Sequence, residues 1–116
     1  MPSQNALRND ETRLDSIFHA LADPTRRAIL RDISSGEKSV SEVARPYRLT
    51  LAAVSKHLNV LQSAELIARE RRGSFQIVRL QPDSLSEADR WLAYYSQFWN
   101  KQLDSMAKFL DGEEDE

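Results

Sequence analysis

Residues 50–80, TLAAVSKHLNVLQSAELIARERRGSFQIVRL, contain a helical pattern followed by two strand patterns, and this order decides the predicted fold. Thr50 is a suitable N-cap residue for the helix. The apolar residues at one-turn and two-turn spacing, which predict a buried stripe, are Leu51, Val54, Leu58 and Leu61. At about 100° per residue, the residues that face away from this stripe are Ala52, Ala53, Lys56 and Asn59. Small residues beside polar ones, Ser55 included, suit the groove of a nucleic acid, although an ordinary amphipathic surface helix fits the same pattern.

The segments on either side of this helix favour the nucleic-acid interpretation. Upstream, Ser39 and Glu42 form an S-x-x-E capping box that opens a short helix, and Pro46 limits its length. Residues 45–49 then form a tight connection, so two helices meet through a turn. Downstream, residues 67–71 and 75–80 are β-branched and aromatic enough to form strands, with Arg72, Gly73 and Ser74 as the reversal. The pattern predicts a helix-turn-helix followed by a basic hairpin, or wing.

Two further helices precede the helix-turn-helix. The first carries Leu14, Ile17, Phe18 and Leu21 on one face. Asp23 and Pro24 then restart the chain as N-cap and first helical residue, and Gly36 is expected to end the second helix in a left-handed conformation.

A last long helix follows Pro82, with Ser84 and Glu87 predicted as a second capping box at its start. Its apolar side chains recur every seven residues and exceed what a small domain can cover, so we expect a two-fold homodimer. A helix packed wholly on its own domain is the alternative. The residues expected at the dimer interface are Leu14, Phe18, Leu85, Leu92, Tyr95, Trp99 and Met106.

Length and composition predict one domain. The 116 residues are 41% hydrophobic, which is enough for a single compact core. The expected fold is mainly α with a small β-hairpin: a disordered tail over residues 1–10, a winged helix-turn-helix domain over 11–111 with dimerisation helices at both ends, and an acidic tail over 112–116. Without cysteine, a signal peptide or an apolar run of about 18 residues, the chain is expected to be cytoplasmic and not bound to a membrane.

Charge is distributed unevenly along the chain, whose formal net charge is −2. Residues 38–80 hold eight basic and three acidic residues, a net of +5, whereas residues 81–116 hold three basic and nine acidic residues, a net of −6. The segment suspected of contacting DNA is therefore the basic one. Solvent ions screen charges beyond roughly 8–10 Å, so an acidic whole chain does not argue against a polyanionic partner.

The order of elements resembles the ArsR/SmtB family of bacterial winged helix-turn-helix repressors. Two strings carry the likeness, FHALADPTRRAIL at 18–30 and SVSEVARPYRLTLAAVSKHLNVLQSAELI at 39–67, and the resemblance covers about residues 14–110. It implies that the helix over residues 50–64 lies in the major groove and that the wing tip follows the DNA backbone or enters the minor groove. The residues expected to contact DNA are Thr50, Ala52, Ala53, Ser55, Lys56, His57, Asn59, Arg69, Arg71, Arg72 and Gly73. For His57, a structural hydrogen bond within the helix-turn-helix is the alternative.

The resemblance has one departure, at Glu65, where the family usually has glycine. If this residue is left-handed, its side chain costs on the order of 1 kcal/mol. Metal sensing, the family's best-known activity, is not expected. Where the family has a cysteine pair this chain has Val43, Ala44 and their neighbours, and its last helix offers Asp89 without any histidine. The strings YYSQFW (94–99) and KHL (56–58) resemble the branch of the family that lacks metal ligands, so no metal or cofactor is expected and the effector is left open.

These observations predict a homodimer that places two recognition helices in successive major grooves of an imperfect palindrome and represses transcription by blocking promoter access. The expected partners are double-stranded DNA and a second copy of the chain. A winged-helix protein-interaction module that does not bind DNA is the alternative. Catalysis is not expected, because Ser55 and His57 are two residues apart on one helix and do not face each other.

Overall fold

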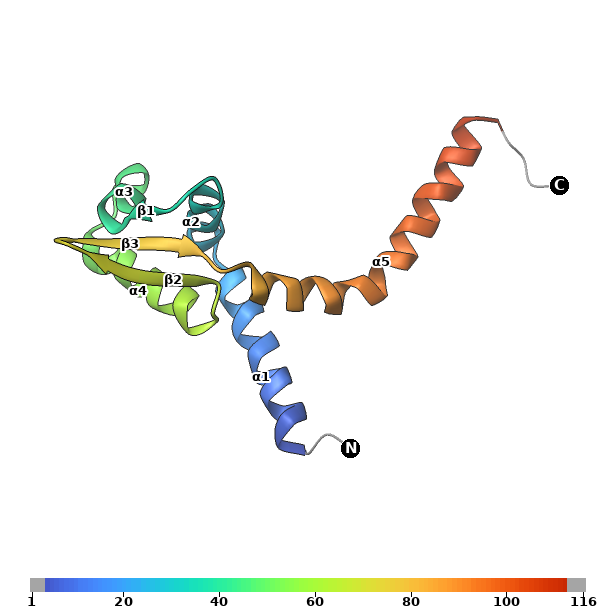
Figure 1. Ribbon diagram of the computed structural model, residues 1–116. Coiled ribbons are helices and arrows are strands. Elements are labelled where there is room, and N and C mark those ends of the chain that lie inside the picture. Colours follow the sequence, from blue (N-terminus) through green and yellow to red (C-terminus); the bar gives the residue numbers. More distant parts are fainter. Residues whose placement is uncertain (1–3, 113–116) are drawn as a thin grey trace.

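The elements follow the predicted order of a winged helix-turn-helix, mainly α with a small antiparallel sheet and a long C-terminal helix (Figure 1). The computed structural model describes residues 4–112, and the surroundings of side chains from residue 12 onward. The elements are α1 (Gln4–Leu21), α2 (Pro24–Ser34), β1 (Lys38–Ser39), α3 (Val40–Ala44), the 3₁₀ turn η1 (Arg45–Tyr47), α4 (Leu51–Ser63), β2 (Ile67–Arg72), β3 (Phe75–Leu80) and α5 (Pro82–Leu110).

The first helix begins earlier than the sequence analysis predicted. We expected a disordered tail over residues 1–10, whereas α1 begins at Gln4. Residues 4–10 contain neither glycine nor proline, and alanine, leucine and arginine there are good helix formers, so their local propensity supports the extra turns. Residues 1–3 and 113–116, at the ends of the two predicted tails, lie outside the described residues.

Three predicted N-caps are confirmed, and they set where the helices of the core begin. The Asp23 carboxylate accepts a hydrogen bond from the backbone N–H of Arg26 at 3.0 Å, and Thr50 Oγ1 accepts one from that of Ala53 at 3.1 Å. The capping box at Ser39 and Glu42 is reciprocal, with backbone-to-side-chain distances of 3.2 and 3.0 Å. Each cap satisfies N–H groups that have no partner within the helix.

The core lies where the first four helices meet the inner face of the sheet. Its largest fully buried side chains are Ile17, Ile29, Ile33, Val43, Val54, Leu58, Leu61, Leu66, Ile67 and Val78. Within α4, the predicted buried stripe is confirmed for Val54, Leu58 and Leu61, which are 0% exposed. Leu51 was predicted to share it, and this was wrong: its side chain is 56% exposed, because the first turn of α4 projects beyond the core.

The predicted hairpin is confirmed, with one strand added. β2 and β3 pair antiparallel from Ile67↔Leu80 to Arg72↔Phe75, so β2 runs one residue further than predicted. The sheet has the order β1-β3-β2, because Lys38 and Ser39 pair with Val78 and Ile77. A two-residue strand carries too short a pattern to be recognised in the sequence. Gly36, expected to be left-handed after α2, has a positive φ of +156°, which favours glycine, although this value differs from that of a left-handed helix.

The C-terminal end of α4 confirms a left-handed Glu65, with a φ of +58°. The N–H of Leu66 donates to the carbonyl of Leu61 at 3.0 Å and that of Glu65 to the carbonyl of Gln62 at 2.9 Å, which is a Schellman motif with glutamate in the glycine position. The hydroxyl of Ser84 donates to the Glu65 carbonyl at 2.9 Å.

The second capping box, predicted at Ser84 and Glu87, was therefore wrong. α5 begins at Pro82, Gln81 is its N-cap residue without a side-chain hydrogen bond, and Ser84 lies inside the helix, 1% exposed. Its hydroxyl binds the end of α4, and Glu87 pairs with Arg13 of α1 at 2.8 Å. The S-x-x-E pattern was present, but its side chains serve contacts between elements instead of a cap.

α5 leaves the rest of the chain and extends far beyond it, as Figure 1 shows. The radius of gyration is 19.3 Å, whereas a compact domain of this length would have about 13 Å. The exposed large hydrophobic residues on this helix are Trp91, Leu92, Tyr94, Tyr95, Phe98, Trp99, Leu103, Met106, Phe109 and Leu110. A single chain leaves this apolar surface in water.

Candidate nucleic-acid interface

The outer face of α4 presents short and polar side chains. Ala52, Lys56 and Asn59 are exposed, and Ser55 is half-buried beside them. At about 100° per residue, these four residues and Leu51 occupy one continuous arc, opposite the arc of Val54 and Leu61. Thr50 lies at the start of this arc as the N-cap, and Ala53 is half-buried at its edge. The short side chains on this face allow the helix backbone to approach another surface closely, and the polar ones can form hydrogen bonds with it.

The turn before α4 is held to the rest of the protein by Tyr47 and Leu49, which both pack against the core. The Tyr47 hydroxyl in η1 donates a hydrogen bond to the Asp32 carboxylate of α2. Burial, together with this carboxylate, raises the pKa of Tyr47 to about 12. Arg48 then turns the chain with a left-handed φ of +53°. The tyrosine thus connects the turn before α4 to α2.

His57 faces the corner between α1 and α2 and not the outer arc of α4. Its Nδ1 atom lies 3.5 Å from Nη1 of Arg26 and 3.9 Å from Oδ2 of Asp23. Arg26 also donates to the carbonyls of His19 and Ala20 at 2.9 and 2.8 Å. The contacts are structural, as the alternative for His57 supposed, but they tie α4 to α2 and its N-cap and do not lie within the helix-turn-helix. A contact of His57 with DNA stays a prediction.

Arg69 joins the wing to the outer face of α4. One guanidinium nitrogen donates to Oδ1 of Asn59 at 2.8 Å, and another donates to Oε1 of Gln76 on β3, also at 2.8 Å. The hairpin and the helix therefore present one surface. Asn59 and Arg69, predicted separately as DNA contacts, bind each other in this structure.

The wing arginines are not equivalent. Arg72 pairs with Glu37 and Glu70, and Arg79 pairs with Glu70 at 2.7 Å. Hydrogen bonds from Arg72 are the main reason that the pKa of Glu70 lies below its usual value, and the two carboxylates raise the pKa of Arg72. Arg71 has no ion pair within the described residues; its Nε donates to the carbonyl of Gly73 at 3.4 Å. Two acidic residues thus neutralise Arg72 and Arg79. Arg69 and Arg71 keep their charge, because among the described residues Arg69 bonds only the neutral side-chain amides of Asn59 and Gln76.

The structure joins Asn59 of α4 to Arg69 of the wing. Arg72, by contrast, lies on the other face of β2 with Glu70, and His57 lies on the flank. Sequence reasoning missed the acidic partners Glu37 and Glu70. Glu37 lies 35 residues from Arg72, and no local pattern indicates a pair over that separation. It also missed Leu51 as an exposed residue, although its position in the first turn of the helix was a signal for it.

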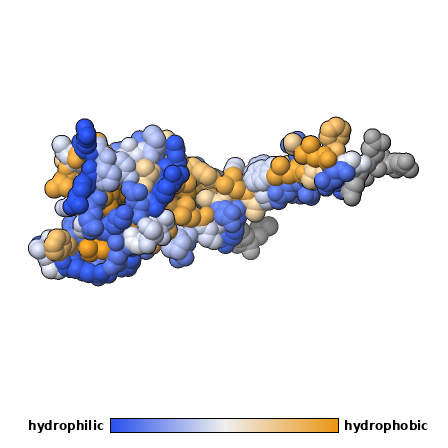
Figure 2. Space-filling view, turned by 90° about the horizontal axis from the view of Figure 1, so that it is seen from above, coloured by the Kyte–Doolittle hydropathy of each residue, from blue (hydrophilic) through white to orange (hydrophobic). Residues whose placement is uncertain are grey.

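Six of the seven residues predicted for a dimer interface divide into two groups. Phe18 and Leu85 pack against the core of their own chain. Leu92, Tyr95, Trp99 and Met106 are each at least 40% exposed on α5. Figure 2 shows hydrophobic residues along one side of the outer part of α5 and hydrophilic residues along the other.

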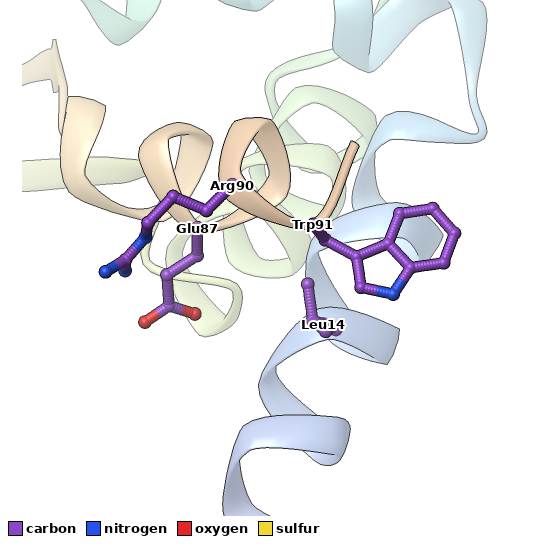
Figure 3. Close-up of a pocket in the computed structure, with 4 residues that line it drawn as sticks. All are labelled: Leu14, Glu87, Arg90 and Trp91. Carbon is purple, nitrogen blue, oxygen red and sulfur yellow. The ribbon is translucent and has the colours of Figure 1, made fainter. Parts of the chain in front are cut away.

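An open hollow of about 360 Å³ lies between α1 and α5 at the inner end of this apolar surface. Its lining residues are Leu14, Glu87, Arg90 and Trp91 (Figure 3). Trp91 also stacks edge-on against Phe18, with ring centroids 5.6 Å apart. Leu14 and the Trp91 ring thus continue the apolar surface of α5 onto α1.

No three histidine, aspartate or glutamate side chains gather as metal ligands in the part of the chain that the structure describes. The helices of residues 4–112 include none with the length and apolar character needed to cross a membrane.

Comparison with known proteins gives consistent matches. A family model described as a helix-turn-helix domain matches residues 21–70. The HTH-type transcriptional regulator Rv2034 of Mycobacterium tuberculosis is 35% identical over 102 residues, which are 88% of this chain and 92% of that protein. The transcriptional repressor SdpR of Bacillus subtilis is 32% identical over 79 residues, which are 68% of this chain and 88% of that protein.

Solved structures agree with these relatives. The crystal structure of the ArsR family transcriptional regulator RHA00566 superposes with a TM-score of 0.72 at 33% identity, covering 78% of this chain and 93% of that one. A homodimeric winged helix-turn-helix DNA-binding domain from Mycobacterium bovis, described as a possible ArsR-family transcriptional regulator, gives a TM-score of 0.60 at 26% identity, covering 90% and 93%.

Proposed function

This chain belongs to the ArsR family of winged helix-turn-helix transcriptional regulators, and from that membership we propose that it is a homodimeric, sequence-specific DNA-binding repressor. The observation that carries the proposal is the joint surface of α4 and the wing, connected by Arg69, in the segment with a net charge of +5. The similarity to the repressor SdpR and to a homodimeric DNA-binding domain supports repression and dimerisation. A regulator of promoters acts where the DNA is, which is the cytoplasm of a bacterium.

The proposed contacts with DNA divide by chemistry. Ala52, Ala53 and Ser55 allow the N-terminal half of α4 to approach base edges in the major groove, and Lys56 reaches a base or a phosphate. Thr50, at the start of α4, lies nearest the edge of the major groove.

The wing contacts the DNA backbone. Arg71 and Gly73 at the wing tip contact phosphates, and Gly73 turns the hairpin with a φ of +60°. Arg69 and Asn59 hold the helix and the wing in a fixed relation, and Arg72 holds the wing through Glu37 and Glu70.

The proposed dimer uses the apolar face of α5. A two-fold partner would cover Leu92, Tyr95, Trp99 and Met106 and fill the hollow beside Leu14. Phe18 of α1 packs against the Trp91 ring and so holds the inner end of this face in place. Two copies present two α4 helices, and successive major grooves of a palindrome provide two equivalent sites.

The test is selection of bound duplexes from a random double-stranded DNA library, followed by footprinting and sedimentation of the protein. We expect a palindromic footprint and a dimer. Lys56→Ala should weaken binding to the selected duplex about fivefold or more, because it removes one charged contact from each half-site. Lys108→Ala removes the same charge near the end of α5 and should leave the affinity unchanged. A protein that is a monomer and shows no sequence preference would instead be a protein-interaction module.

A further inference from the structure

Leu51 is an exposed apolar residue on the outer arc of α4, and it neither caps the helix nor packs in the core. Its side chain is 56% exposed in the first turn of the helix. It shares a ridge with Ser55 and Asn59 at four-residue spacing, and Arg69 of the wing binds Asn59. Leu51 therefore lies on the same ridge of α4 as the residue that binds the wing, within the basic segment, and not on the apolar surface of α5.

The chemistry of the DNA major groove limits what this side chain can contact. Leucine neither donates nor accepts hydrogen bonds, so it gains affinity only by excluding water from another apolar group. The bases present nitrogen and oxygen edges in the major groove, and the one apolar group projecting there is the C5-methyl of thymine. Ala52, the exposed neighbour, widens the apolar part of the arc with a methyl group of its own.

We propose that Leu51 gives this protein specificity for thymine at one position of each half-site, by packing against the thymine methyl in the major groove. This inference rests on the proposed DNA-binding function and adds the base that is read. An exposed leucine elsewhere on a surface needs no explanation, but this one would lose its water when α4 enters the groove. A purine or cytosine at that position leaves the leucine facing a polar edge.

The test replaces single thymines by deoxyuridine in the duplex that the wild-type protein selects from a random library. Deoxyuridine lacks the C5-methyl group and keeps the same base pair. At one thymine per half-site, the replacement should lower wild-type affinity by roughly fourfold, or about 15-fold for both halves, the equivalent of one buried methylene-sized group each. The same replacement outside the footprint is the DNA control.

Leu51→Ala should bind the selected duplex and lose this difference between thymine and deoxyuridine, because the partner of the methyl group is gone. Leu51→Met keeps an apolar side chain of similar volume and should retain the difference. Both variants should fold, because the residue is exposed and alanine and methionine favour helices. Sequence-specific binding in which Leu51→Ala discriminates as well as the wild type overturns the inference and leaves the proposed function intact. Absence of any sequence-specific binding overturns both.

Discussion

Replacing the two wing arginines one at a time should separate a phosphate contact from a structural ion pair. Arg71 has no carboxylate partner among the described residues, whereas Arg72 is held between Glu37 and Glu70. Each phosphate contact contributes about 0.9 to the slope of log affinity against log salt concentration. A dimer has two wings, so Arg71→Ala should reduce the slope by about 1.8. Between about 50 and 200 mM salt, the variant should then lose roughly 12-fold less affinity than the wild type.

Arg72→Ala should behave differently, because its guanidinium already neutralises carboxylates. The slope should change by less than about 0.5, while affinity falls at every salt concentration, since Glu37 loses its ion pair near the DNA backbone and Glu70 keeps only Arg79. Fluorescence anisotropy of a labelled, selected duplex across the salt series measures both quantities. Lys108→Ala controls for the loss of one charge per protomer. Equal reductions of the slope by both wing variants would refute the reasoning, because Arg72 would then exchange its carboxylates for phosphate on binding.

Three further predictions follow from other parts of the chain. Glu65→Gly should raise the free energy of unfolding by about 1 kcal/mol and the melting temperature by roughly 3–6 °C, because glycine adopts the φ of +58° without strain. Glu65→Ala keeps a Cβ and should raise neither, and calorimetry at fixed protein concentration distinguishes the two variants. Trp99→Glu should convert the dimer to a monomer in sedimentation, while Gln97→Glu, on the polar side of α5, should leave it dimeric. The Ser39 backbone N–H and hydroxyl hold the pKa of Glu42 below its usual 4.5, so this carboxylate stabilises the fold above pH 4.5 and loses that effect as pH falls. Glu42→Gln keeps the cap and should make the free energy of unfolding, measured in urea, decrease less as pH is lowered. An unchanged decrease at acidic pH would contradict this.

Local rules predicted the helix-turn-helix because its signals lie within a few residues of each other. Asp23, Ser39 and Thr50 were recognised as N-caps, and each forms the expected hydrogen bond within three residues. The same rule failed at Ser84, where the sequence pattern is equally good. There the hydroxyl finds a partner 19 residues away, the carbonyl of Glu65, and the N-cap is Gln81, three residues before Ser84. A pattern that is identical in sequence thus has different outcomes depending on tertiary contacts.

The candidate site shows the same division between local and distant information. Periodicity placed Ala52, Lys56 and Asn59 on the outer face of α4, and the structure agrees. It could not show that Asn59 binds Arg69 or that Glu37 binds Arg72, because these pairs are 10 and 35 residues apart and depend on how the hairpin folds over the helix. Counting basic residues therefore overstates the positive charge that the wing can offer to phosphate.

The separation of charge along the chain gives the proposed dimer a preferred approach to DNA. The basic segment, residues 38–80, contains the turn, α4 and the wing. The acidic segment, residues 81–116, includes α5, which extends away from the domain on the side opposite the wing tip (Figure 1). A polyanion is attracted to the first segment and repelled by the second within a screening length of roughly 8–10 Å. Because Glu37 and Glu70 cancel Arg72 and Arg79, the remaining attraction is concentrated near α4, Arg69 and Arg71. Non-specific binding should consequently be weak, and base contacts along α4 should carry a larger share of the affinity than the number of arginines in the hairpin indicates.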